Sequence, residues 1–484
     1  MNPMRIRLTE EEVGKITLGL GWNTWSWRGK PLDDKAWGQL LELFVASRCQ
    51  WVRLDVRQAD WEPRDSRKAG YAFDTPRMKS LYRWLDACEK HDIHVLWANY
   101  FTSDPELYAS DPESAWMSRC VQESLAGTGA YPKEWPQKDE PADHAHFVES
   151  FADVLKHLVV EKGYQCVRQV SLFNEATSDH TFAAHNPWPF YRLLDAALRA
   201  RGLRDRIQIL GPDDHNVPRW FWREFLDFPI DIVAFHDYWN FFNPDRVDAA
   251  SGLEDYHTCS QVIRGSLGDY AQVAAVLRAF SSKHGTVAHV AITEYGHMGN
   301  TYKVLPTGGA REVFGGALSL KCFLCEILKL GCGGALRWSR WPGAWGHSFA
   351  PVSVEGVRFN SGGLDMAEAL RQGAPMVKVP CVYEPERLAN TVIRRGDAVI
   401  RGQADDAPPG VHWVVLKDPT GRLKAFLVNL RSEAVILEWE GRGETWNHLS
   451  YQGDEHSDLV ETPLRAENGS VNVTLAARSV NGLI

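Results

Sequence analysis

The sequence predicts an α/β fold, a (β/α)8 TIM barrel followed by a smaller antiparallel β-sandwich, and two observations carry this prediction. Between about residues 16 and 375, short apolar runs alternate with longer amphipathic stretches. The runs are continuous in Val, Ile and Leu, which is typical of parallel strands covered on both faces. From about residue 376 onward, shorter strand-like segments separated by turn signals replace this alternation. We therefore assign residues 1–375 to the barrel and 376–484 to the sandwich, with residues 1–12 able to pair with the sandwich.

The barrel strands are expected in eight apolar runs, which matches the eight strand–helix units of this fold. The runs are Ile16–Trp22, Trp51–Leu54, Ile93–Ala98, Val167–Phe173, Ile207–Leu210, Ile230–Phe235, Val287–Thr293 and Gly334–Trp338. A doubly wound open sheet is the alternative, and it is disfavoured because no strand is followed by a G-x-G-x-x-G turn.

The helices are expected where apolar residues recur at helical spacing between these runs. The stretches are Asp33–Arg48, Thr75–Lys90, Phe147–Lys162, Phe190–Arg201, Tyr270–His284 and Glu312–Leu330. Thr75 followed by Pro76 is typical of a helix start. A glycine follows several of these stretches where a helix-ending residue belongs, at Gly163, Gly202, Gly285 and Gly331.

The sandwich strands are expected in seven short segments after residue 376. They are Val377–Val382, Thr391–Arg395, Ala398–Gln403, His412–Lys417, Lys424–Asn429, Ala434–Trp439 and Ser470–Leu475. The N-terminal piece Met4–Leu8 is a candidate for a further strand of this sheet.

Composition excludes several classes of function. There are 62 acidic and 53 basic residues, a formal charge of −9, which argues against a nucleic-acid partner and against a polybasic membrane-surface protein. No apolar run reaches membrane-spanning length, because charged residues such as Lys321 and Arg337 interrupt the best candidate, Val313–Trp338. No apolar leader precedes the barrel, so a cytoplasmic location is expected. Neither a P-loop nor a G-x-S-x-G nucleophile elbow is present. We expect no cofactor.

Two carboxylates follow strongly apolar strands, where a barrel places its catalytic groups. They are Glu175, after the fourth strand, and Glu294, after the seventh. Strands four and seven lie across the barrel mouth from each other, so both side chains can face one sugar ring. Glycosidic hydrolysis needs one group that protonates the leaving oxygen and one that attacks the anomeric carbon or activates water. The alternative interpretation, a loop residue or ion-pair partner, is stronger for either residue taken alone than for both together.

The segment Ser171-Leu-Phe-Asn-Glu-Ala176 resembles the strand-four motif of the clan A retaining glycoside hydrolases, and Ala291-Ile-Thr-Glu-Tyr-Gly296 resembles their strand-seven motif. The resemblance implies that Glu175 is the acid/base and Glu294 the nucleophile. It further implies that Asn174 binds the sugar 2-hydroxyl, Arg53 supports the nucleophile, Tyr238 lies near its oxygen and Trp338 floors the sugar subsite. Asn99 stands where that group often has a histidine.

Aromatic and polar residues on the predicted site side add candidates for sugar binding, because sugar C–H faces pack well on aromatic rings. The tryptophans are Trp22, Trp25, Trp27, Trp97, Trp239, Trp338, Trp341 and Trp345, of which about half are expected to pack in the core instead. The polar candidates for hydroxyl recognition are Asp55, Asn99, Asp213, Asp214, His215 and His236.

A metal site is the alternative for the H-x-H pair His144 and His146. This pair falls at a helix start rather than at the first strand end, so we assign it to the surface and expect no metal. Cys322 and Cys325 form a lone C-x-x-C inside an apolar helix, which favours packing over metal binding.

These observations predict a retaining, exo-acting β-glycosidase on small oligosaccharides or glycosides. The insertion Phe101–Asp143, which could close one end of a cleft, favours exo action. The alternatives are an endo-acting polysaccharide hydrolase and a non-catalytic carbohydrate-binding barrel. Gluco, galacto, xylo, manno and arabino configurations stay open, as does the oligomeric state. Retention requires carboxyl groups about 5–5.5 Å apart and inversion about 6.5–9.5 Å.

Overall fold

The computed structural model describes residues 3–24, 33–99, 144–174, 188–215, 229–239, 289–297, 310–338, 351–355, 369–370, 372–405, 407–440, 445–453, 458–467 and 469–484. The described residues form two compact units. One contains those up to residue 51 together with those from residue 237 onward, and the other contains those from 52 to 236.

Eight strands hydrogen-bond in the closed order β2-β3-β4-β5-β6-β7-β8-β9, which confirms the predicted barrel. Their bounds are β2 Gly19–Asn23, β3 Trp51–Val56, β4 His94–Asn99, β5 Val167–Ser171, β6 Gln208–His215, β7 Ile232–Trp239, β8 His289–His297 and β9 Gly334–Arg337. Each of the eight apolar runs in the sequence is therefore a strand. Their side chains are almost all buried, as expected for strands covered on both faces.

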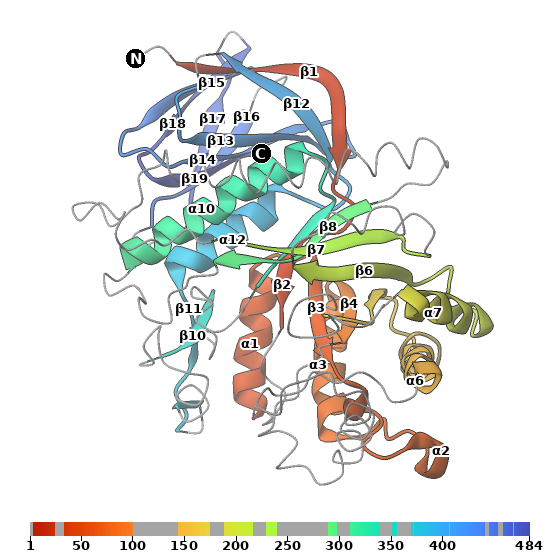
Figure 1. The fold of residues 1–484 in the computed structure, drawn as a ribbon. Coiled ribbons are helices and arrows are strands. Elements are labelled where there is room, and N and C mark those ends of the chain that lie inside the picture. The colour runs from red at the N-terminus through yellow and green to blue at the C-terminus, as the bar shows by residue number, and fades with distance from the viewer. Residues whose placement is uncertain are drawn as a thin grey trace, which may run out of the picture. The chain divides into compact units, whose positions relative to one another are not determined.

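The helices that the structure describes begin and end close to the predicted positions (Figure 1). This holds for α1 Asp34–Ala46, α3 Pro76–Lys90, α6 His144–Lys156, α7 Trp188–Ala200 and α10 Ala310–Lys329. The structure also has helices that the sequence did not predict, α2 Ser66–Ala69, α12 Pro380–Val392 and a 3-10 turn, η1 Gln58–Asp60. The N-terminal cap of α3 is Thr75, whose Oγ1 accepts a hydrogen bond from the Met78 amide at 3.1 Å. The predicted helix 270–284 lies outside the described residues.

The structure adds two details to the predicted helices, the shape of the helix at 147–162 and the conformation of the glycines at helix ends. The stretch predicted as one helix, 147–162, is α6 followed by a π-helical turn, η2 His157–Glu161. Gly163, Gly202 and Gly331 follow helices with φ of 84°, 65° and 95°. Glycine adopts this left-handed conformation without the steric cost that a Cβ brings, which explains its place at these helix ends.

The second region is one continuous sheet in the order β17-β16-β19-β14-β13-β12-β1-β15-β18. Its strands are β1 Met4–Lys15, β12 Ala398–Asp405, β13 Val411–Lys417, β14 Leu423–Asn429, β15 Val435–Glu440, β16 Thr445–Tyr451, β17 Val460–Arg465, β18 Ser470–Leu475 and β19 Ser479–Leu483. The N-terminal strand β1 pairs antiparallel with β12 and parallel with β15, and the other neighbours are antiparallel. The N-terminal residues thus join the two halves of this sheet.

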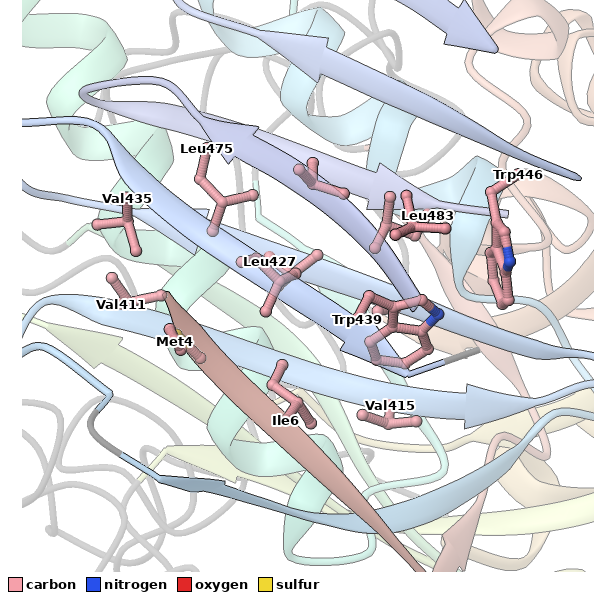
Figure 2. Packing of buried hydrophobic residues seen from close by; sticks show 14 of the residues in the cluster. Met4, Ile6, Val411, Val415, Leu427, Val435, Trp439, Trp446, Leu475 and Leu483 are labelled. Carbon is pink, nitrogen blue, oxygen red and sulfur yellow. The ribbon is translucent and has the colours of Figure 1, made fainter. Parts of the chain in front are cut away.

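The sheet surrounds a single hydrophobic core, to which strands from both of its halves contribute (Figure 2). Ile6 of β1, Leu427 of β14 and Trp439 of β15 are fully buried there. Trp439 and Trp446 meet edge to face with ring centroids 5.7 Å apart. Such a pair adds about 1 kcal/mol to the free energy gained by burial of the rings.

Part of the region just after residue 376 is helical, so the strands predicted at 377–382 and 391–395 are wrong in large part. A short strand, β11 Met376–Lys378, pairs with β10 Val352–Val354, and α12 follows it. Pro380 occupies the first turn of α12, where its fixed φ suits a helix. This helix is buried on nearly all sides and contains Pro385 in its interior, a residue that normally argues against a helix.

The helices that the structure describes include none that is both long and apolar enough to cross a bilayer. The longest, α10, carries Lys321 and Glu326 among its buried apolar residues.

The core position of β1 can be tested with two isoleucines of the same sheet. Ile6 is fully buried, whereas Ile436 on β15 is 44% exposed. Ile6→Ala should lower the free energy of unfolding by about 2–5 kcal/mol, because it leaves a cavity. Ile436→Ala should lower it by about 1 kcal/mol or less, since water already reaches that side chain. Urea unfolding followed by circular dichroism measures both, and equal losses would contradict the placement of β1.

Candidate active site

A buried arginine connects three strands within the unit of residues 52–236. Nη2 of Arg53, on β3, donates to Oδ1 of Asn174 at 2.7 Å and to Oδ2 of Asp213 at 3.0 Å. Its Nη1 lies 3.5 Å from Oδ1 of Asp55. Nε2 of His236, on β7, lies 3.1 Å from the second oxygen of Asp213. Five of the residues predicted from the sequence as site candidates are therefore joined in one network.

Asp213 owes its position to an irregularity in β6. The register between β6 and β7 shifts between Pro212 and Asp214, which leaves Asp213 as an extra residue with φ of 61°. A bulge of this kind redirects a side chain out of the strand's regular alternation. A non-glycine residue in the left-handed region is uncommon, and such residues concentrate at functional sites. The backbone here thus holds a buried carboxylate between Arg53 and His236.

The contact with Arg53 also fixes the orientation of the Asn174 amide. Because Oδ1 accepts from the guanidinium, Nδ2 is left as the donor that points elsewhere. This agrees with the role implied for Asn174 as a donor to a sugar hydroxyl. Asn99 uses its own Nδ2 on the Leu172 carbonyl at 3.1 Å, so it braces the chain just before Asn174. The predicted sugar contact of Asn99 stays a prediction.

Glu294 lies in a second irregularity, within the unit that contains residues 237–484. The register between β8 and β9 shifts between Ile292 and Tyr295, and Glu294, only 2% exposed, falls in this stretch. Nδ2 of Asn23 donates to the Thr293 carbonyl at 2.9 Å, and the Trp338 amide donates to the Tyr295 carbonyl at 2.8 Å. Both neighbours of Glu294 in the chain are therefore held by hydrogen bonds.

Trp338 directly follows β9 and is buried, with its backbone tied to β8 as just described. Asn23, at the end of β2, makes a second hydrogen bond to the Arg337 carbonyl at 3.2 Å. The ends of β2, β8 and β9 are thus joined by one asparagine side chain. The predicted role of Trp338 as the floor of a sugar subsite stays a prediction.

Two of the predicted sugar-stacking residues are buried among aromatic rings. Trp22 is 1% exposed and packs edge to face on Phe44 of α1 and Tyr383 of α12. Trp97 is fully buried with its ring centroid 6.1 Å from that of Trp61. Side chains alternate between the two faces of a strand, and these two positions face the surrounding helices or aromatic core. The predicted sugar contacts of Trp22 and Trp97 stay predictions, and the packing explains why these positions carry large apolar rings.

Several predicted residues lie outside the described part of the chain. These are Glu175, Trp25, Trp27, Trp341 and Trp345, and for Tyr238, Trp239, Asp214 and His215 only the backbone is described. The separation of the two catalytic carboxyl groups, and with it the distinction between retention and inversion, stays a prediction.

His146, half of the H-x-H pair, lies with Glu62 and Asp65 so that their ligand atoms are within 4.8 Å of one another. Glu62 accepts from the Ser66 amide at 2.9 Å and from Nε2 of Gln58 at 2.6 Å, and it also contacts Nε2 of His146 at 2.6 Å. Asp65 pairs with Arg67. Hydrogen bonds and an ion pair thus already engage the carboxylates of this cluster, which braces α6 against the segment before it.

Sequence reasoning missed a buried ion cluster formed by Tyr295, Lys321, Arg337 and Glu386. The signal was present for two of its members, because Lys321 and Arg337 are charges within a long apolar stretch. Buried charges of this kind require partners. The partner, Glu386, lies on the helix that the sequence did not reveal.

Comparison with known proteins gives a fold but no family. No family model matches the chain, and no curated protein matches it. Among solved structures, a conserved exported protein from Bacteroides fragilis is similar over 100% of both chains, with a TM-score of 0.70 and 13% identity.

Two glycoside hydrolases are similar as well. A family 30 subfamily 8 xylanase from Clostridium acetobutylicum aligns over 100% of this chain and 99% of its own, with a TM-score of 0.62 and 14% identity. A family 51 α-L-arabinofuranosidase from Bifidobacterium longum aligns over the same shares, with a TM-score of 0.59 and 14% identity. At this level of identity the likeness establishes the architecture, a barrel with an additional β region.

The network around Arg53 predicts a large difference between two Asp→Asn substitutions. Asp213→Asn should lower the free energy of unfolding by about 3 kcal/mol, because the buried guanidinium loses its closest anionic partner. Asparagine tolerates positive φ, so the backbone of the bulge is not the cause. Asp65→Asn, in the exposed pair with Arg67, should cost about 1 kcal/mol or less. Urea unfolding distinguishes the two, and a small effect at Asp213 would contradict the network.

Proposed function

We propose that this chain is a retaining glycoside hydrolase that cleaves O-glycosidic bonds by double displacement. The observation that carries the proposal is the pair of strand ends built around Asn174 and Glu294. Asn174 is held by a buried arginine immediately before Glu175, and Glu294 is buried in a bulge at the end of β8. The likeness to a xylanase and an arabinofuranosidase supports the same class of reaction.

In the proposed reaction Glu175 protonates the leaving oxygen while the Glu294 carboxylate attacks the anomeric carbon. The glycosyl-enzyme that results has no charge on Glu294, which favours the carboxylate form that Glu175 reached when it gave its proton to the leaving oxygen. Glu175 then accepts a proton from water as the water attacks the same carbon, and both residues return to their first state. Asn174 donates through Nδ2 to the hydroxyl next to the anomeric carbon, where a hydrogen bond strengthens in the transition state.

The remaining predicted substrate contacts belong to this proposal. Trp338 and Trp341 stack on the sugar, and Tyr238 lies near the nucleophile. Arg53 supports the nucleophile, and it also holds Asn174, Asp213 and Asp55 within its unit. His236 shares Asp213 with Arg53 and so has its ring orientation set by the same carboxylate.

We propose exo action on small oligosaccharides or glycosides with β-linkages, in the cytoplasm, as the sequence predicts. The second candidate is endo action on a polysaccharide, and it is favoured by the likeness to an endoxylanase of Clostridium papyrosolvens, with a TM-score of 0.59 and 12% identity. A panel of aryl α- and β-glycosides, together with xylan, separates the two. Exo action releases single sugars from the aryl glycosides, whereas endo action shortens xylan to mixed oligosaccharides. Turnover of neither would favour the carbohydrate-binding alternative.

The stereochemistry of the first product tests the double displacement directly. NMR of the reaction at early times should show a product anomer of the same configuration as the substrate, because two inversions at one carbon restore it. The opposite anomer would indicate a single displacement and would remove Glu294 from the role of nucleophile.

The roles of the two glutamates predict different kinetic losses. Glu294→Gln should reduce turnover to background on every substrate, since an amide does not form the glycosyl-enzyme. Glu175→Gln should slow glycosides with poor leaving groups by about 10²–10⁴-fold and spare bond cleavage of dinitrophenyl glycosides, which need no proton. Glu433→Gln, at a side chain 58% exposed, is the control and should keep the wild-type rate. Near-normal turnover by Glu294→Gln would defeat the assignment.

A further inference from the structure

Four buried side chains from two strands and two helices form one ion cluster. Nζ of Lys321, on α10, lies 2.6 Å from Oε2 of Glu386, on α12, and donates to the Tyr295 hydroxyl at 3.2 Å. Nη1 of Arg337, on β9, donates to the other oxygen of Glu386. One carboxylate therefore holds two cations, and one of these cations holds a tyrosine of β8.

The electrostatics keep the cluster in this hydrogen-bonding state. Burial tends to raise the pKa of Glu386, but Lys321 and Arg337 outweigh it and hold that pKa below its ordinary value. Burial, joined by the nearby Glu386 carboxylate, raises the pKa of Tyr295 well above its ordinary value, so its hydroxyl keeps its proton. Burial, with Arg337, lowers the pKa of Lys321 although Glu386 opposes this.

The free energy of folding alone does not explain why these charged groups are buried together. All four groups of the cluster are removed from water. Apolar residues of similar volume usually stabilise a core at least as well as buried ion pairs do. The explanation for the cluster therefore lies in the chain segments that it fixes in place.

What the cluster holds is the irregular stretch of β8 that carries Glu294. Tyr295 is fixed through its hydroxyl by Lys321 and through its carbonyl by the Trp338 amide. Arg337 is fixed through its guanidinium by Glu386 and through its carbonyl by Asn23. Because the regular β8–β9 ladder is interrupted at Glu294, the backbone there depends on such contacts more than a regular strand does.

The helices α10 and α12, which carry Lys321 and Glu386, are themselves packed in the core. Within this unit α12 packs on α10, on β2 and on β14, β16 and β19 of the nine-stranded sheet, while α10 packs on β13 (Figure 1). Lys321 and Glu386 are therefore placed by a packed core rather than by a loop, as a positioning device requires.

We propose that Lys321 and Glu386 are positioning residues, which hold Tyr295 and Arg337 so that Glu294 and Trp338 stay in the geometry that the reaction needs. They act on the reaction from outside the barrel strands, without touching substrate. The inference rests on the proposed function, because it concerns the same nucleophile.

Two mild substitutions test this without leaving an unpaired buried carboxylate. Lys321→Met keeps the Arg337–Glu386 pair as a neutral unit and fills the same volume, and Tyr295→Phe removes one hydroxyl while keeping the ring. Each should lower kcat by about tenfold or more on the aryl glycoside that the panel identifies, since small displacements of a reacting group are costly. KM should stay within about twofold, and Tm within about 3 °C. Lys329→Met, the same change on the same helix at a lysine paired with Glu326, should leave kcat unchanged.

The result that overturns the inference is distinct from the result that overturns the proposed function. Wild-type kcat in both Lys321→Met and Tyr295→Phe, with Glu294→Gln inactive, would reject positioning and leave the glycosidase assignment in place. The same holds if a burst titration of active sites accounts for the whole loss, since the surviving enzyme would then be fully active. An active Glu294→Gln variant would reject the proposed function itself.

Discussion

The guanidinium of Arg53 is the constraint on which the candidate site depends. A fully buried cation requires anionic or strongly polar partners, and it finds them in Asp213, Asp55 and Asn174. Each partner comes from a strand or from the short segment that follows one, so the single charge of Arg53 fixes side chains in three segments of the chain. The hydrogen bond from Arg53 orients the amide of Asn174. Asp213, which Arg53 also holds, orients the ring of His236.

Both strand irregularities that involve carboxylates follow from the architecture. A parallel strand covered on both faces offers no solvated position for an acid, so a carboxylate is tolerated only where the ladder ends or is interrupted. Asp213 occupies the interruption in β6, and Glu294 occupies that in β8. The first is stabilised by Arg53 within its unit, and the second by hydrogen bonds to its chain neighbours Thr293 and Tyr295.

Much of the fold was predictable because its signals are local. Continuous apolar runs located all eight barrel strands, and the Thr75-Pro76 pair located a helix start. Trp22 shows the limit of this reasoning, because a strand-end tryptophan has the same local pattern whether its ring faces a ligand or, as here, Phe44 and Tyr383. For the site, the sequence indicated Arg53, Asn174, Asp213 and His236 individually. Their contacts join residues up to 160 positions apart in the chain and become visible only in three dimensions.

The helix α12 was the least predictable element, and it has the widest consequences. It follows the change in composition near residue 376, yet it packs on the barrel strand β2 and supplies Glu386 to Arg337 of β9. Without this helix, Lys321 and Arg337 would lose the buried carboxylate that both of them contact. The change in strand pattern near residue 376 therefore marks where barrel strands give way to strands of the nine-stranded sheet. The contact of Glu386 with Lys321 and Arg337 shows that the chain on both sides of this change contributes to one core.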